Sequence, residues 1–276
     1  MVALRRGVLA VSVLHDVDIE PNLQGVRLTG RRTVFVSWNE CRRALAGLDP
    51  ESDDGRLRLA AWLQARRWAH DLPLAALRER LRPVGLPVDH LLHPGPDWAQ
   101  QHVLGDALDL GLGAVGIDPH NAERVVVLPP TVLTARRVDA ALAWPQAATY
   151  LEQMGRLAAE GLTRRGDGKL RPVGDCDVVT LLGSRSLRAA LARAYDGLGQ
   201  VAAPMRTRGW SRLALADPAF APAAWEATSA PERGFPRPLL VTRDEVVLAQ
   251  PGGDPLELVL RDPVLTKTWD RDVLYR

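Results

Sequence analysis

Lysine is nearly missing from this chain of 276 residues: of its 35 basic residues, only Lys169 and Lys267 are lysine. Isoleucine is equally scarce, at Ile19 and Ile117. Arginine, alanine, leucine, valine and glycine take their places, which is the pattern that a GC-rich coding sequence produces. Arginine clusters are therefore weak evidence for a partner, because codon usage alone can supply them.

Cysteine is also rare, and Cys41 and Cys176 are the two in the chain. A chain of this length buries a core without disulfides, so we expect reduced thiols in a cytoplasmic protein. No apolar run approaches the roughly 20 residues that a membrane-spanning helix needs, and no membrane partner is expected. The apolar run over residues 7–14 has no small-residue cleavage site after it, so we expect a first β-strand there.

The net charge of +2 predicts no strong general attraction to nucleic acid or membranes. The distribution is less even, because residues 156–212 hold 11 basic and 5 acidic side chains. Besides an ordinary solvated surface, this local excess is compatible with an anion-facing surface in the C-terminal half.

Periodicity and turn residues predict a mixed fold of the α+β class. In the N-terminal part, apolar segments at 26–28 and 33–36 flank a Thr-Gly-Arg-Arg turn, which predicts a β-hairpin. Helical spacing and stop signals then predict a short helix ending near residue 45 and helices over 57–70 and 74–82. Residues 83–98, rich in proline, glycine and histidine, are expected to form a loop, and 125–128 a buried strand.

The C-terminal part is expected to contain a β–α–β element. The apolar and mostly β-branched segment 178–182 predicts a strand buried on both faces. Helical spacing over 186–198 and a strand from Val201 complete the unit. A helix over 150–162 precedes it. A C-terminal antiparallel meander is expected from three apolar segments, at 239–242, 246–249 and 256–260.

We place a domain boundary near Pro145. It separates an N-terminal α+β region, 1–145, from a C-terminal α/β region, 146–276. A single interwoven domain is the alternative.

The preferred site is the turn Gly183-Ser184-Arg185-Ser186, between the strand and the helix expected on either side of it. A helix N-terminus presents free amides and partial positive charge, which suit a phosphate or carboxylate. Ser184 can cap this helix, and Arg185 and Arg188 add charged donors. These five residues predict a site for a small anionic ligand, although the same features also open ordinary helices.

Two further motifs are weaker. His90, His93 and His102, near Asp89 and Asp97, include a His-x-x-His spacing that zinc can use, but a Pro-Gly-Pro segment interrupts the cluster. Residues 111–116 match the dinucleotide pattern G-x-G-x-x-G, but a proline follows too soon for the helix that this motif requires. We expect a flexible turn or bulged strand at 111–116, and no cofactor.

The alternative to a ligand-binding or regulatory protein is an interaction module for nucleic acid or protein. Its surface would use the eight tryptophans of the chain and the arginines of the expected helices at 57–70 and 74–82. Those arginines are at positions 56, 58, 66, 67, 78, 80 and 82. Whether the protein catalyses a reaction stays open, since Cys176 has no histidine after it in the chain to serve as its base.

Overall fold

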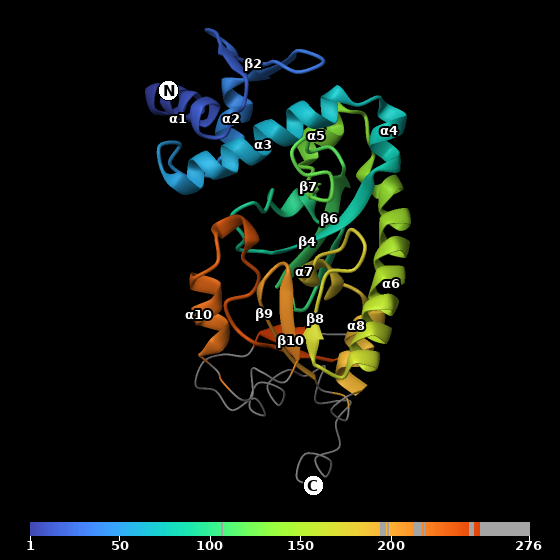
Figure 1. Ribbon diagram of the computed structural model, residues 1–276. Coiled ribbons are helices and arrows are strands. Elements are labelled where there is room, and N and C mark those ends of the chain that lie inside the picture. Colours follow the sequence, from blue (N-terminus) through green and yellow to red (C-terminus); the bar gives the residue numbers. More distant parts are fainter. Residues whose placement is uncertain are drawn as a thin grey trace.

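The computed structural model describes residues 1–105, 107–193, 197, 199–211, 217, 219–242 and 246–248. Their helices and three antiparallel sheets confirm the α+β class (Figure 1). No helix in these ranges has the length and apolar character needed to cross a bilayer.

The first 45 residues form helices and a small sheet at one end of the molecule (Figure 1). The elements are α1 (Val2–Leu14), β1 (Ile19–Pro21), β2 (Gly25–Leu28), β3 (Val34–Ser37) and α2 (Trp38–Ala44). The hairpin is confirmed, with Leu28 opposite Val34 in an antiparallel pair. The short helix is confirmed too, because Ser37 and Glu40 form a reciprocal capping box at the start of α2.

The strand expected within residues 7–14 is wrong, because this segment belongs to α1. Leu4, Val8 and Val11 recur at spacings of four and three residues, and all three are buried. α1 packs against α3 (Asp53–Asp71). The helical period becomes visible only when the residues before position 7 are included.

The centre of the molecule is a four-stranded sheet beside α3 (Figure 1). Its strands are β4 (Leu81–Pro87), β5 (Gln101–Val103), β6 (Leu108–Val115) and β7 (Val125–Val127), in the order β4-β6-β5, with β7 also paired to β6. The predictions of a helix over 57–70 and of a strand at 125–128 are confirmed. The second helix, α4 (Leu74–Glu79), ends earlier than expected, and part of the expected loop is β4, because β6 needs a partner.

Proline is tolerated in β4 because this strand is at the edge of its sheet. Pro83, Gly85 and Pro87 alternate along it, so their backbone nitrogens all lie on the side away from β6. The amide of Gly85 donates to the Thr180 hydroxyl at 2.9 Å, and the two prolines have no N–H to satisfy. Proline and glycine predict a loop here, although their spacing of two residues fits one side of an edge strand.

The glycines of residues 111–116 provide space for neighbouring side chains. The segment is largely in β6, whose register with β4 is regular, and is therefore neither a flexible turn nor a bulge. A Cβ at Gly111 would overlap the Trp98 indole, and one at Gly113 would crowd Val84. The match to a dinucleotide motif reflects this packing.

The remaining described elements surround a second large sheet. Helices α5 (Pro130–Ala135) and α6 (Ala140–Arg165) precede it. Its strands are β8 (Lys169–Leu170), β9 (Gly199–Met205), β10 (Arg208–Ser211), β11 (Leu239–Val241) and β12 (Val246–Leu248), in the order β12-β11-β9-β10-β8. Helices α7 (Val178–Leu181), α8 (Arg185–Arg193) and α10 (Phe220–Glu226) pack against β9 or β4.

The strand expected at 178–182 is wrong, and with it the β–α–β unit. Asp177 accepts a hydrogen bond from the backbone N of Thr180 at 2.7 Å and caps α7, a short helix that is buried on all sides. Burial on both faces was inferred correctly, but a buried helical turn has the same apolar pattern. The helix expected over 186–198 is confirmed for 186–193, and residues 194–196 and 198 are outside the described ranges, as are 256–260. The strand from Val201 and the pairing of β11 with β12 are confirmed.

The long helix α6 connects the two large sheets. It contacts β4 and β6 of one sheet, β8 of the other, and both α7 and α8 (Figure 1). The expected helix at 150–162 is part of it, as is Pro145, and the division of the chain at 145 stays a prediction. Gly155 allows α8 to approach, because a Cβ there would overlap the Ser184 side chain.

We predict that Gly155→Ala destabilises the protein by about 1–3 kcal/mol, because the overlap with Ser184 outweighs the gain in helix propensity. The matched control is Gly161→Ala in the same helix, where the new Cβ meets only the flexible end of Arg165. This control should raise the free energy of unfolding by about 0.5–1 kcal/mol. Urea unfolding of the two variants measures the difference, and equal effects would contradict the close α6–α8 contact.

Candidate functional site

The predicted anion site is at the start of α8, where a carboxylate of the chain itself is bound. Glu152 of α6 accepts hydrogen bonds from the backbone N of Arg185 (2.8 Å) and of Ser186 (3.2 Å). It also accepts from the hydroxyls of Ser184 (3.1 Å) and Ser186 (2.9 Å). Three of the predicted site residues, Ser184, Arg185 and Ser186, thus donate to an internal carboxylate. An external anion would have to displace Glu152, and its binding here stays a prediction.

Arg188, the last of the predicted site residues in the sequence, is only 4% exposed. Its guanidinium donates to the carbonyls of Leu182 (2.9 Å) and Gly183 (2.7 Å), just beyond α7. It thus satisfies acceptors left over at a helix end.

The bonds to Glu152 change its acidity. Burial by itself raises the pKa of a carboxyl group, but the hydrogen bonds from Arg185, Ser186 and Ser184 outweigh this effect and lower the pKa of Glu152. A lowered pKa in the folded state means that the ionised form stabilises the fold. That contribution is present above the pKa of the unfolded chain and is lost as the pH falls through the folded value.

We predict that Glu152→Gln lowers the free energy of unfolding at pH 7 by about 1–2 kcal/mol, because charge-assisted bonds to the start of α8 are lost. The deficit relative to the wild type should shrink as the pH falls below about 4.5, because the carboxyl of the unfolded wild-type chain takes up a proton before that of the folded protein does. Denaturant unfolding of both proteins at pH 7 and below about pH 4.5 measures the deficit, with the exposed Glu160→Gln in the same helix as control. A deficit that does not depend on pH would contradict a role for the charge.

The histidine region contains a hydrogen-bonded cluster centred on a buried aspartate. Asp109 of β6 is 3% exposed, and its two oxygens contact His93 Nε2 at 2.9 Å and His102 Nδ1 at 2.6 Å. His93 Nδ1 accepts from the Gly95 amide, so Nε2 carries the proton that faces Asp109. His90 is apart from this cluster and accepts from the backbone N of Leu92. Among the described residues, no three His, Cys, Asp or Glu side chains are arranged to hold a metal ion.

Burial makes two of these histidines hard to protonate. Burial and the nearby charge of Arg206 lower the pKa of His90 to about 3. Burial also lowers the pKa of His93, although Asp109 opposes the effect. Both rings are therefore neutral in the folded protein at pH 7. As the pH falls below about 6.5, the unfolded chain takes up protons that the folded chain does not, and stability decreases.

We predict that His90→Asn flattens the decline of stability with acidification. Between pH 6.5 and pH 5 the free energy of unfolding of the wild type should fall by about 1–2 kcal/mol more than that of the variant. The reason is that His90 is protonated in the unfolded wild-type chain but not in the folded protein. The Asn side chain keeps an acceptor for the Leu92 amide. Urea unfolding across this pH range measures the slopes, with the exposed His120→Asn as control; parallel curves for the wild type and His90→Asn would contradict the prediction.

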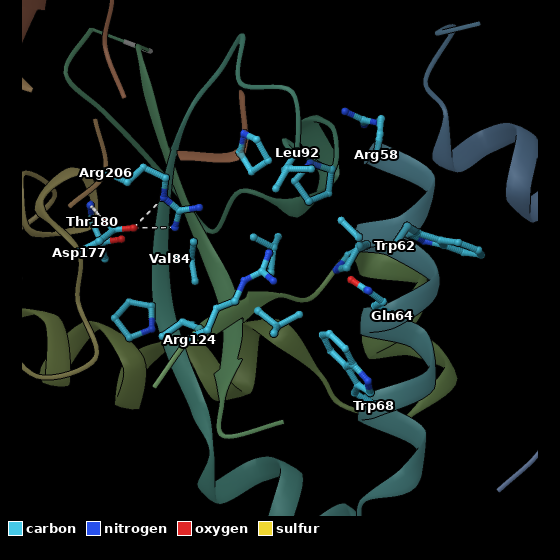
Figure 2. A pocket seen from close by; sticks show the side chains of 18 of the residues that line it. Arg58, Trp62, Gln64, Trp68, Val84, Leu92, Arg124, Asp177, Thr180 and Arg206 are labelled. Atoms are coloured by element: carbon cyan, nitrogen blue, oxygen red, sulfur yellow. Dashed lines mark hydrogen bonds and ion pairs between the residues drawn. The ribbon is translucent and has the colours of Figure 1, made fainter. Parts of the chain in front are cut away.

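A cavity of about 550 Å³ lies between α3 and the four-stranded sheet. Figure 2 shows Gln64 and Trp68 of α3 on one side, Val84 of β4 at the centre, and Asp177 with Arg206 across from the helix. Trp68 is 7% exposed and Val84 is 1% exposed. These two parts of the wall therefore belong to the packed core.

Polar side chains hold the walls in place. The guanidinium of Arg58 donates to the carbonyls of Ala44 (2.7 Å), Leu91 (2.6 Å) and His93 (2.7 Å), which ties α3 to the loop at the cavity edge. On the opposite side, Arg206 donates to Asp177 Oδ2 from two nitrogens, at 2.6 and 2.7 Å. Both arginines are thus used structurally.

Cys176 also lines the cavity, but as a buried thiol. Burial, together with the charges of Asp177 and Asp175, raises its pKa far above the usual range. The thiol is therefore protonated at neutral pH and a poor nucleophile.

The arginines expected to form a nucleic-acid surface bind largely to the chain itself. Arg80 donates to the carbonyl of Gly116, and Arg82 contacts Asp175 at 2.5 Å. Arg66 donates to the carbonyl of Thr131 at 3.0 Å. The second helix of the expected pair, α4, has six residues and is followed directly by β4.

The sequence did not indicate the cavity, because its lining comes from segments far apart in the chain. The available signal was Trp62 and Trp68 on one helix, next to an arginine-rich face. Comparisons of the chain with protein family models, with curated proteins and with solved structures gave no match.

Proposed function

We propose that this protein binds a small organic molecule in the cavity between α3 and the four-stranded sheet. The cavity volume of about 550 Å³ carries the proposal. It falls within the roughly 300–1,000 Å³ typical of ligand pockets in proteins. Its walls combine apolar surface from tryptophan and valine side chains with polar and charged groups, several of which are held by hydrogen bonds within the chain.

Preformed walls favour binding, because a ligand would not have to order them. Arg58 spans from α3 to the loop that contains Leu91 and His93, and the Arg206–Asp177 pair fixes the far side. Ordering mobile side chains costs affinity, and these side chains are already held by hydrogen bonds. The structure supports a binding or regulatory role more directly than an interaction surface for nucleic acid, since Arg58, Arg66, Arg80 and Arg82 donate hydrogen bonds within the chain.

We predict that Ala61→Trp abolishes or weakens binding of the neutral fluorophore phenylnaphthylamine by at least about tenfold, since the new side chain occupies the cavity. Ala61 of α3 lines the cavity. Direct excitation of the probe and a titration of its emission give the dissociation constant.

The control is Ala141→Trp at an exposed position of α6, which should bind like the wild type. Thermal unfolding must show that both variants are folded. Undiminished binding by a folded Ala61→Trp variant would place the probe elsewhere and contradict the proposal.

A further inference from the structure

Arg124 is presented to the cavity by a loop that its own polar groups organise. Asn121 Oδ1 accepts from the backbone N of Glu123 (3.1 Å) and of Arg124 (3.2 Å), and Asp118 Oδ1 accepts from the backbone N of His120 (2.9 Å). These short-range bonds are the turns that asparagine and aspartate favour. The loop leads directly into β7, so the sheet fixes the position of Arg124.

The guanidinium of Arg124 extends into the middle of the cavity, between β4 and α3 (Figure 2). Its side chain is 43% exposed, and its contact with Asp118 Oδ2 is long, at 3.4 Å. A guanidinium has five N–H donors, and this contact uses one of them at most. Arg58 and Arg206, by contrast, spend their donors on several short bonds.

The carboxylates around the cavity restrict the charge that a ligand can carry. The lining holds four arginines and six acidic side chains: Arg43, Arg58, Arg124, Arg206, Glu40, Asp97, Glu123, Asp175, Asp177 and Glu232. Asp177 and Asp175 are neutralised by Arg206 and Arg82. Asp97, Glu123 and Glu232 are exposed, where water and salt weaken their fields. Repulsion by the remaining carboxylates grows with the charge of the ligand, so two or three negative charges are disfavoured more than one.

The rest of the lining suits an apolar body. Trp68 and Val84 are buried core residues with surface facing the cavity, and Val125 and Val127 of β7 continue the apolar wall. Aromatic walls contribute contact area and favour flat, ring-containing molecules.

Building on the proposed function, we infer that the ligand is an amphipathic organic anion with a single negative charge, such as an aromatic carboxylate or sulfonate. Its charged group pairs with the guanidinium of Arg124, and its apolar body lies against Trp68 and the valines of β4 and β7. Asp118 keeps Arg124 directed at the ligand. Polyphosphates, nucleotides included, are disfavoured by the acidic excess of the lining.

The experiment compares two fluorophores with one aromatic skeleton. Anilinonaphthalene sulfonate carries a single negative charge, and phenylnaphthylamine carries none. Wild-type protein should bind the sulfonate about tenfold more tightly than the neutral probe, and Arg124→Gln should remove that preference. Binding of phenylnaphthylamine should change by less than about twofold in this variant, because its contacts are apolar.

Two control variants separate charge from structure. Arg124→Lys keeps the positive charge and should retain part of the preference for the sulfonate, whereas Arg164→Gln, exposed on α6, should bind both probes as the wild type does. Equal affinities of the wild type for both probes, or an unchanged preference in Arg124→Gln, would overturn the anionic ligand while leaving the proposed cavity function standing. Failure of both probes to bind, or binding that is unchanged in Ala61→Trp, would overturn both the anionic ligand and the proposed cavity function.

Discussion

The carboxylate of Glu152 joins α6, which packs on the central sheet, to α8, which packs on the second sheet. It lies on α6, which packs along β4 and β6, and it binds the first amides of α8, which follows α7. Asp177, the cap of α7, holds Arg206 at the cavity wall. One side of the cavity is thereby positioned relative to the other through a helix terminus bound by an internal anion. The desolvation of that carboxylate is offset by the hydrogen bonds that it accepts.

Local signals in the sequence predicted much of the secondary structure. The hairpin around residues 29–32, the short helix ending near residue 45 and the helices over 57–70 and 150–162 follow from neighbours a few residues apart. At 7–14 and 178–182 the prediction of a strand was wrong, because a short apolar run fits a strand and a buried helical turn equally well. At 83–87 and 111–116 proline and glycine predicted a loop or turn where the structure has β4 and β6. Tertiary packing makes that choice, and it is invisible in a window of five to eight residues.

An external anion at the start of α8 stays a prediction. Ser184, Arg185 and Ser186 donate to Glu152, and nothing near them in the sequence identifies this internal partner, since it is more than 30 positions away. The cavity is harder still to foresee. Its wall residues come from α2, α3, β4, the loop before β7 and the segment before α7. In the sequence, each of these segments looks like an ordinary helix, strand or loop. Only the folded arrangement makes Arg124 and Trp68 neighbours of one space.

The alternation of Pro83, Gly85 and Pro87 has a consequence for self-association. An edge strand with free amides is a template on which another chain can add a strand. Along the outer side of β4 two positions have no N–H at all, and the third gives its N–H to Thr180. On its outer side β4 therefore offers a second chain no free amide at Pro83, Gly85 or Pro87, which makes this border of the central sheet a poor template for an added strand.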